Sequence, residues 1–155
     1  MERTFIDQIE KGQGEEVCLR GWVFKIKSFG KFGFAFLRDK SGIVQLVIED
    51  MEILQELKLE MALKVIGSVM ENDKAPGGFE IRVSKIEIAG KTYYDLLPFS
   101  INQKTVNATL ETELDFRYIS LRRPDRRAVF KIQEEIVEAF RNFLRGKKFS
   151  EIHTP

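Results

Sequence analysis

The sequence has very little of the chemistry that builds disulfides or structural zinc sites. Its 155 residues include one cysteine, Cys18, and one histidine, His153. An intrachain disulfide needs two cysteines and a structural zinc site needs about four Cys or His ligands, so both are excluded. A single cysteine is typical of a protein in a reducing compartment.

Long apolar runs are also missing from the sequence. No run approaches the ~20 residues that a membrane-spanning helix requires, and residues 1–12 lack the apolar core of a secretion signal. We therefore expect a soluble, cytoplasmic protein with no membrane partner. The hydrophobic fraction of 43% is sufficient for a packed core, and the 13 phenylalanines exclude the composition of a disordered chain.

The common catalytic motifs do not occur. The sequence contains no phosphate-binding loop and no glycine-rich dinucleotide fingerprint. We expect His153 to be structural or solvent-facing and Cys18 to be packed rather than reactive. No catalytic residue and no metal ligand is therefore predicted.

The net charge of +1 conceals a segregation of charge along the chain. Residues 16–48 carry six basic and two acidic side chains. Residues 49–80 carry three basic and eight acidic ones, and residues 117–148 carry ten basic and four acidic ones. A polyanion would be drawn to the two basic segments. A charge run can equally be a solvated surface, so the pattern has functional meaning only if the fold and the aromatic residues agree with it.

Alternating apolar residues predict five β-strands in the first part of the chain. The expected strands are residues 15–28, 32–38, 43–49, 62–70 and 79–88, with a short helix at 52–59. A phase shift at Gly21 predicts a bulge, the feature that bends a strand round a small barrel. Three strands, a helix and two strands is the order of the OB-fold, a mainly β, five-stranded Greek-key barrel that often binds oligonucleotides. A different small all-β barrel is the alternative.

The second part of the chain is predicted to be helical. Residues 101–124 show no clear period and are expected to be a linker after a barrel domain at 1–100. An amphipathic helix is expected at 125–145, because its apolar residues are spaced three and four apart. These residues are Val129, Ile132, Ile136, Phe140 and Phe143. Residues 149–152 are expected to start a strand, so that residues 125–155 form the beginning of a second domain.

Strand alternation also sorts the barrel residues by face. With Trp22, Phe24 and Ile26 assigned to the interior, the outward face gathers aromatic, cationic, amide and carboxylate side chains. The members of this set are Lys25, Lys27, Phe34, Phe36, Arg38, Gln45, Glu80 and Arg82. Rings stack on bases, cations bind phosphates, and Gln and Glu bond base edges, so the set is typical of a surface for single-stranded nucleic acid. The alternative is that Phe34 and Phe36 pack beneath a loop or the linker.

Two separate motifs resemble class II aminoacyl-tRNA synthetases of the aspartate, asparagine and lysine subgroup. Residues 114–155, with the form RYxxLRRPxxxAVFKI, resemble the motif 1 region, most closely that of archaeal-type aspartyl enzymes. Residues 21–48, with GWV, F-x-x-L-R-D and G-I-V-Q, are similar to the OB-fold anticodon-binding domain of that subgroup. Lys148 departs from the pattern, since the family usually has glycine there. The family's motifs 2 and 3, which carry the ATP chemistry, are not among these 155 residues.

The resemblance implies that tRNA is a partner. Phe34 would stack on the central anticodon base, Gln45 and Glu80 would hydrogen-bond anticodon bases, and Lys27 would contact a base or the backbone. The motif 1 helix would build the homodimer interface of the catalytic domain. The interface residues would be Val129, Ile132, Ile136, Phe140, Phe143 and Pro155.

The resemblance also implies that the chain is the N-terminal part of an aspartate–tRNA ligase. ATP and Mg²⁺ would serve the full-length enzyme, while this chain alone would hold no cofactor and would not aminoacylate tRNA. A fragment of an asparagine–tRNA ligase is an alternative, because the central anticodon base is U in both tRNAs. Two further alternatives are a freestanding OB-fold nucleic-acid-binding module without catalysis and a paralogue that serves protein assembly.

Overall fold

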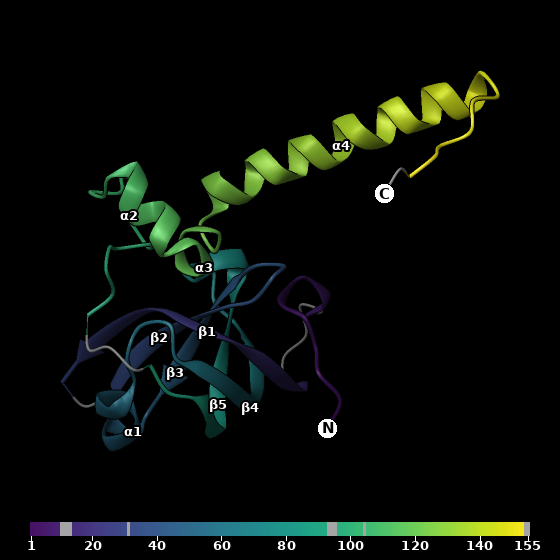
Figure 1. Cartoon of the computed structure of the whole chain (residues 1–155). Coiled ribbons are helices and arrows are strands. Elements are labelled where there is room, and N and C mark those ends of the chain that lie inside the picture. The colour runs from purple at the N-terminus through teal and green to yellow at the C-terminus, as the bar shows by residue number, and fades with distance from the viewer. Residues whose placement is uncertain (10–13, 31, 93–95, 104, 154–155) are drawn as a thin grey trace. The chain divides into compact units, whose positions relative to one another are not determined.

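The computed structural model describes residues 1–9, 14–30, 32–92, 96–103 and 105–153. The chain forms two compact units, Met1–Leu97 and Pro98–Pro155. The first unit contains all the strands in the described part of the chain, and the second contains only helices and irregular segments there (Figure 1).

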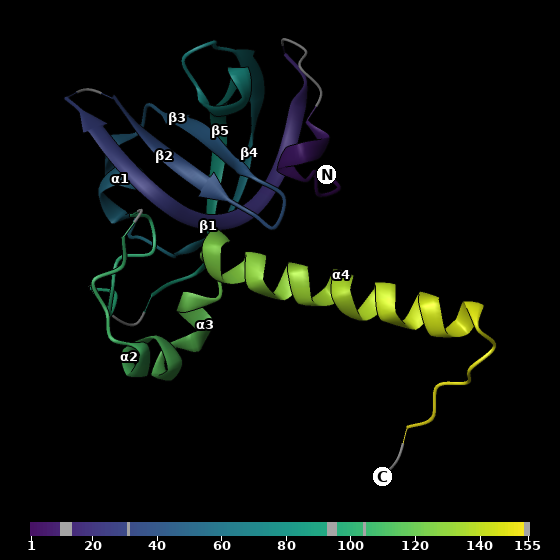
Figure 2. The ribbon, with the colours of Figure 1, turned by 90° about the horizontal axis from the view of Figure 1, so that it is seen from above.

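The first unit is a closed barrel with the strand order β1-β2-β3-β5-β4. Its elements are η1 (Ile6–Gln8), β1 (Glu16–Phe29), β2 (Phe32–Arg38), β3 (Ile43–Ile48), α1 (Met51–Glu56), β4 (Ala62–Glu71), η2 (Pro76–Gly78) and β5 (Phe79–Gly90). The long strand β1 curves along the barrel wall and pairs with both β2 and β4 (Figure 2). All pairs are antiparallel except β3 with β5. The predicted OB-fold, with its helix between the third and fourth strands, is confirmed.

Apolar side chains from all five strands fill the barrel interior. Those that are at most 1% exposed include Leu19, Val23, Leu37, Val44, Leu46, Ile48, Leu63, Val65, Val69 and Ile81. Full burial of one such side chain stabilises the fold by about 1.5–3 kcal/mol. The opposite phase of each strand is left outside, and this phase carries the candidate site.

The phase of β1 differs from the prediction. The bulge lies between Val23 and Lys25 rather than at Gly21. Val23 is fully buried and Trp22 is 37% exposed, so the assignment of Trp22 to the interior was wrong. A bulge sets two residues opposite one on the partner strand, so the inward and outward faces exchange where it occurs. Lys25, which follows the bulge, is exposed as predicted.

Arg38 is buried instead of lying on the outward surface. Its Nη2 donates to both carboxylate oxygens of Glu60 at 2.9 Å, and the two side chains are 7% and 4% exposed. Glu60 adopts a left-handed backbone conformation with φ of 64°, and its N–H donates to the carbonyl oxygen of Val23 at 2.8 Å. The assignment of Arg38 to the exposed outward surface was therefore wrong, because a residue from the segment between α1 and β4 covers it.

Asp39 joins the N-terminal segment to the turn between β2 and β3. Its carboxylate accepts hydrogen bonds from the Ser41 N–H at 2.7 Å, the Ser41 hydroxyl at 2.6 Å, the Gly42 N–H at 3.0 Å and the Ile6 N–H at 3.1 Å. Burial alone would raise the pKa of the Asp39 carboxyl, but these hydrogen bonds outweigh it and hold the pKa below its usual range. The ionised form of Asp39 therefore stabilises the folded barrel.

The second unit contains α2 (Leu110–Asp115), α3 (Arg117–Ser120) and α4 (Pro124–Gly146). The long amphipathic helix was predicted, but residues 101–124 contain two helices where a linker was expected. Those helices have six and four residues, which is too short for a periodic apolar pattern. The strand expected at 149–152 is not formed in the described residues; this unit has no described strand with which it could pair.

Lys148 occupies a position after α4 that favours glycine. Its φ is 66°, and the N–H of Phe149 donates back to the carbonyl oxygen of Leu144 at 3.1 Å. A left-handed residue just beyond a helix end is usually glycine, because glycine has no Cβ to clash. The departure from the glycine of the resembled motif therefore leaves the turn intact and places a strained lysine in it.

The ion pair of Arg38 with Glu60 can be tested by removing one partner. In Glu60→Ala the guanidinium stays buried without its carboxylate, so we expect the unfolding free energy to fall by about 3–5 kcal/mol. Urea denaturation followed by circular dichroism measures this change. The double variant Arg38→Met/Glu60→Leu is the control and should recover most of the loss, because it leaves no buried charge. A loss below about 1 kcal/mol in Glu60→Ala would contradict the assignment.

Asp39 predicts a pH dependence of stability. Its pKa is lowered on folding, so its contribution is present above the unfolded pKa of about 3.9 and is lost as pH falls through the folded value. Asp39→Asn should therefore lower the unfolding free energy more at pH 7 than near pH 3. Urea titrations at both pH values test this, with the exposed Asp73→Asn as control. An equal loss at both pH values would show that the charge of Asp39 is irrelevant.

Candidate nucleic-acid interface

Strand register places the outward side chains in two adjacent rows across four strands. The first row contains Lys25, Phe36, Gln45 and Glu80, and the second contains Lys27, Phe34, Val47 and Arg82. Neighbouring strands lie about 4.8 Å apart, so each row is about 14 Å long. All the predicted nucleic-acid contacts except Arg38 therefore lie together on one face of the barrel.

The aromatic part of this face comes from β2. Phe34 and Phe36 are half-buried, whereas Ala35 and Leu37, on the opposite phase, are fully buried. The Lys27 Nζ lies 5.5 Å from the centroid of the Phe36 ring. Gly33 precedes Phe34 and must be small, because a β-carbon there would overlap a methyl group of Leu54 in α1. The face thus offers partly exposed rings beside a cation, and α1 supports the strand that carries them.

The polar part of the face is a network around Glu80. The Gln45 Nε2 and the Asn72 Nδ2 each donate to the Glu80 Oε2 at 2.8 Å. The Asn72 Oδ1 accepts from the Lys74 N–H at 3.0 Å, which fixes the amide. Charge-assisted hydrogen bonds of this kind are stronger than neutral ones. Glu80 is therefore held in place before any ligand binds.

Asn72 was missed by sequence reasoning because it lies in a loop after β4, where strand alternation gives no information. The only local signal is that Asn commonly accepts a hydrogen bond from a backbone N–H two residues later in a turn. Within the described part of the chain, the other oxygen of Glu80 and the Oε1 of Gln45 accept no hydrogen bond. The network therefore presents acceptors that suit the N–H groups of a base edge.

Arg82 ends the second row. Its Nη2 donates to the Glu49 Oε1 at 2.7 Å, and the two side chains are 62% and 65% exposed. An ion pair exposed to this degree contributes at most about 1 kcal/mol. Arg82 can therefore exchange this carboxylate for a phosphate at little cost.

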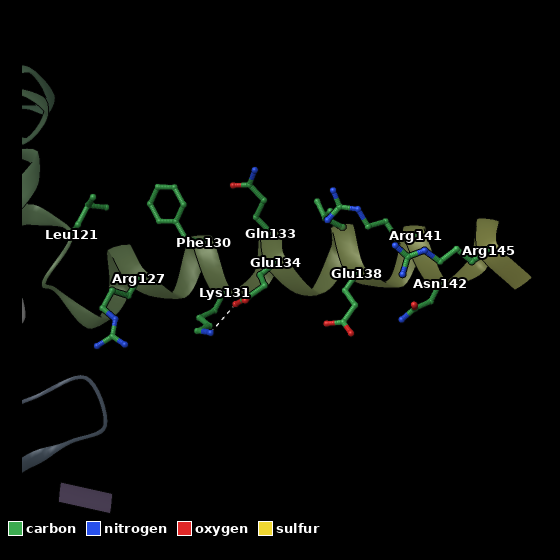
Figure 3. A pocket seen from close by; sticks show the side chains of 11 residues that line it. Leu121, Arg127, Phe130, Lys131, Gln133, Glu134, Glu138, Arg141, Asn142 and Arg145 are labelled. Atoms are coloured by element: carbon green, nitrogen blue, oxygen red, sulfur yellow. Dashed lines mark hydrogen bonds and ion pairs between the residues drawn. The ribbon is translucent and has the colours of Figure 1, made fainter. Parts of the chain in front are cut away.

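Helix α4 carries the other set of predicted residues. The exposed fractions of Val129, Ile132, Ile136, Phe140 and Phe143 range from 58% to 63%, and α4 has no buried residue. Figure 3 shows the charged side of the helix, where the Lys131 Nζ donates to the Glu134 Oε2 at 2.7 Å and where Phe130 lies among the charged side chains. Pro155 lies outside the described residues. The five apolar side chains form what we call the apolar stripe of α4.

Two kinds of site are absent from the described residues. No three His, Cys, Asp or Glu side chains among them are grouped closely enough to hold a metal ion. None of the helices in the same residues combines the length and the apolar character needed to cross a membrane.

Comparison with protein-family models gives two matches. Residues 17–89 match the OB-fold nucleic acid binding domain, and residues 109–155 match tRNA synthetases class II (D, K and N). The chain is 39% identical to the aspartate–tRNA(Asp/Asn) ligase of Methanopyrus kandleri over 156 aligned residues. This alignment covers 96% of this chain and 36% of that protein. It is 35% identical to the ligase of the same name from Archaeoglobus fulgidus, over 92% of this chain and 34% of that one. The chain thus spans about a third of the length of these curated relatives.

Solved structures give a concordant picture. Asparaginyl-tRNA synthetase from Pyrococcus horikoshii, complexed with asparaginyl-adenylate, matches with a TM-score of 0.83 at 29% identity, over 100% of this chain and 37% of that one. Aspartyl-tRNA synthetase from Entamoeba histolytica matches with a TM-score of 0.86 at 26% identity, over 99% of this chain and 39% of that one. Enzymes named for aspartate and for asparagine are therefore both among the similar proteins.

Proposed function

The chain corresponds to the N-terminal region of the class II aminoacyl-tRNA synthetases of the Asp, Asn and Lys subgroup, and from this premise we propose that its barrel binds the anticodon loop of tRNA. The observation that carries the proposal is the pair of rows on the outward face. These rows bring rings, cations and a pre-positioned carboxylate within about 14 Å, which suits a few unpaired nucleotides.

Each part of the face has a distinct role in this proposal. Phe34 stacks on the central anticodon base, since a half-buried ring on a strand offers a rigid platform. Gln45 and Glu80 bond the edge of a base, and Asn72 holds Glu80 for that purpose. Lys25, Lys27 and Arg82 neutralise phosphates, and Phe36 adds apolar surface beneath Lys27. Stacking and phosphate contacts supply affinity, whereas hydrogen bonds to base edges supply selectivity.

We further propose that the whole protein is an aspartate–tRNA ligase, with an asparagine–tRNA ligase as the alternative. The relatives named above carry both amino acids in their names, and the anticodon face does not separate them. The match at residues 109–155 favours a synthetase over a freestanding binding module. ATP and Mg²⁺ belong to the chemistry of the whole enzyme, and the 155 residues alone are expected to bind tRNA without charging it.

The apolar stripe of α4 supports a second proposal, that this helix pairs with a second copy in the assembled enzyme. Five large apolar side chains that are more than half exposed along one helix face are typical of an interaction site. The charged side of α4, with Arg127 and Glu138, is suited to water. The stripe therefore gains most by burial against a like surface.

Phe34 and Gln45 are expected to respond differently in binding to an anticodon stem-loop with U at the central position. Phe34→Ala should weaken binding by about 1–3 kcal/mol, the usual loss for one base–aromatic stack, or roughly 5- to 150-fold. Gln45→Ala should mainly reduce the preference for U over C at that position. Fluorescence titrations with both stem-loops measure the two effects. Lys85→Ala, which removes an exposed cation outside the two rows, is the control.

Urea denaturation of the same variants separates binding from folding. Phe34→Ala should lose about 0.5–2 kcal/mol of unfolding free energy, because it removes contacts with two neighbouring rings outside the barrel and leaves the interior packed. Leu37→Ala, in the barrel interior, should lose about 2–5 kcal/mol. A folded Phe34→Ala variant that binds both stem-loops like the wild type would end the assignment of this face.

The stripe of α4 predicts self-association. Sedimentation equilibrium should show a dimer whose population rises with concentration, because the five side chains leave water on pairing. Ile136→Glu should shift the equilibrium to monomer by placing a charge in the middle of the interface. Glu138→Gln, on the charged side, is the control and should leave it unchanged. A wild-type chain that stays monomeric at all concentrations would exclude pairing through α4 alone.

A further inference from the structure

Phe29 and Phe32 extend the outward face beyond the residues discussed above. They are the last pair in the register of β1 with β2, and they share the outward phase of Lys27 and Phe34, which are two residues away on each strand. Phe29 is 54% exposed and Phe32 is 44% exposed. The hairpin therefore ends in two large rings that are largely open to water.

The three rings at this end of the hairpin form one cluster. The centroids of Phe29 and Phe32 lie 6.2 Å apart with 25° between the ring planes. The Phe34 centroid lies 5.7 Å from that of Phe29 and 5.6 Å from that of Phe32, with the planes inclined by 67° and 80°. Because each ring contacts the other two, these contacts restrict the side-chain rotamers before a ligand binds, which lowers the side-chain entropy lost on binding.

Hairpin stability alone does not account for the exposure of these rings. One aromatic cross-strand pair supports a hairpin, and residues next to a turn are commonly small or polar. Instead, the rings are open to water on the face of β1 that also carries Lys27, two residues from Phe29 and opposite Phe34. Exposed rings beside cations suit a partner that combines flat apolar surfaces with negative charge. Single-stranded RNA has both, in its bases and its phosphates.

We propose that Phe29 and Phe32 form a second stacking platform, which holds a base adjacent to the one that stacks on Phe34. The proposal rests on the anticodon-loop function above and extends it by one nucleotide toward the hairpin tip. Every base has a π-face, so the platform adds affinity without sequence preference. It leaves the choice of base to the Glu80 network.

The experiment combines protein variants with abasic stem-loops. Phe29→Leu/Phe32→Leu keeps apolar packing at the tip and removes the flat rings. This double variant should bind the intact stem-loop roughly 5- to 150-fold more weakly, with an unchanged preference for central U. An abasic nucleotide on one side of the central position should weaken the wild type by a similar factor and should leave the double variant almost unaffected. Phe149→Leu, which replaces a 65% exposed ring outside the barrel, is the control.

The outcomes distinguish this proposal from the one on which it rests. If Phe34→Ala weakens binding and the double Leu variant binds within about twofold of the wild type, only the second platform is wrong. The second platform is also wrong if removing a flanking base weakens binding by the double variant as much as it weakens binding by the wild type, whichever of the two flanking bases is removed. If neither Phe34→Ala nor the double variant alters binding, the anticodon-loop function itself fails. Urea denaturation confirms that the variants compared are folded.

Discussion

The parallel pairing of β3 with β5 is the contact on which both the barrel and its outward face depend. It consists of the register pairs Gln45 with Glu80, Leu46 with Ile81, and Val47 with Arg82. Leu46 and Ile81 are fully buried in the core, whereas Gln45 and Glu80 meet outside at 2.8 Å. The pairing that removes two open sheet edges therefore also brings together side chains that are 35 residues apart in sequence.

Uninterrupted strands explain why most of this face could be predicted. In the parts of β2, β3 and β5 that carry the two rows, buried and outward residues alternate without interruption. Phe34, Gln45 and Glu80 were therefore assigned correctly to the outside. In β1 the bulge moved the change of phase by a few residues, and Trp22 was assigned to the wrong face. Sequence alternation detects that a bulge exists, but its position depends on pairing with β2, which is not a local property.

The residues that sequence reasoning misplaced or missed depend on partners from other segments. Arg38 is buried because Glu60 folds over it, and nothing near Arg38 in the sequence indicates this. Asn72 reaches Glu80 from a loop. In the second unit, Glu113 accepts two hydrogen bonds from Arg126 at 2.7 and 2.8 Å, and this pairing lowers the pKa of Glu113. That contact joins α2 to α4 across 13 residues, and no period in the sequence reveals it.

The network around Glu80 has a consequence for how selectivity arises. In the proposed complex, the right base replaces water on a carboxylate that two amides already hold, so the number of hydrogen bonds hardly changes. A net gain from such an exchange is about 0.5–1.5 kcal/mol, while a charged acceptor left dry and unpaired costs more than about 1–3 kcal/mol. Discrimination is then mainly a penalty on the wrong base. The aromatic rings would then determine the affinity for the anticodon loop, and the carboxylate would determine which loops are rejected. Affinity and selectivity could therefore change independently.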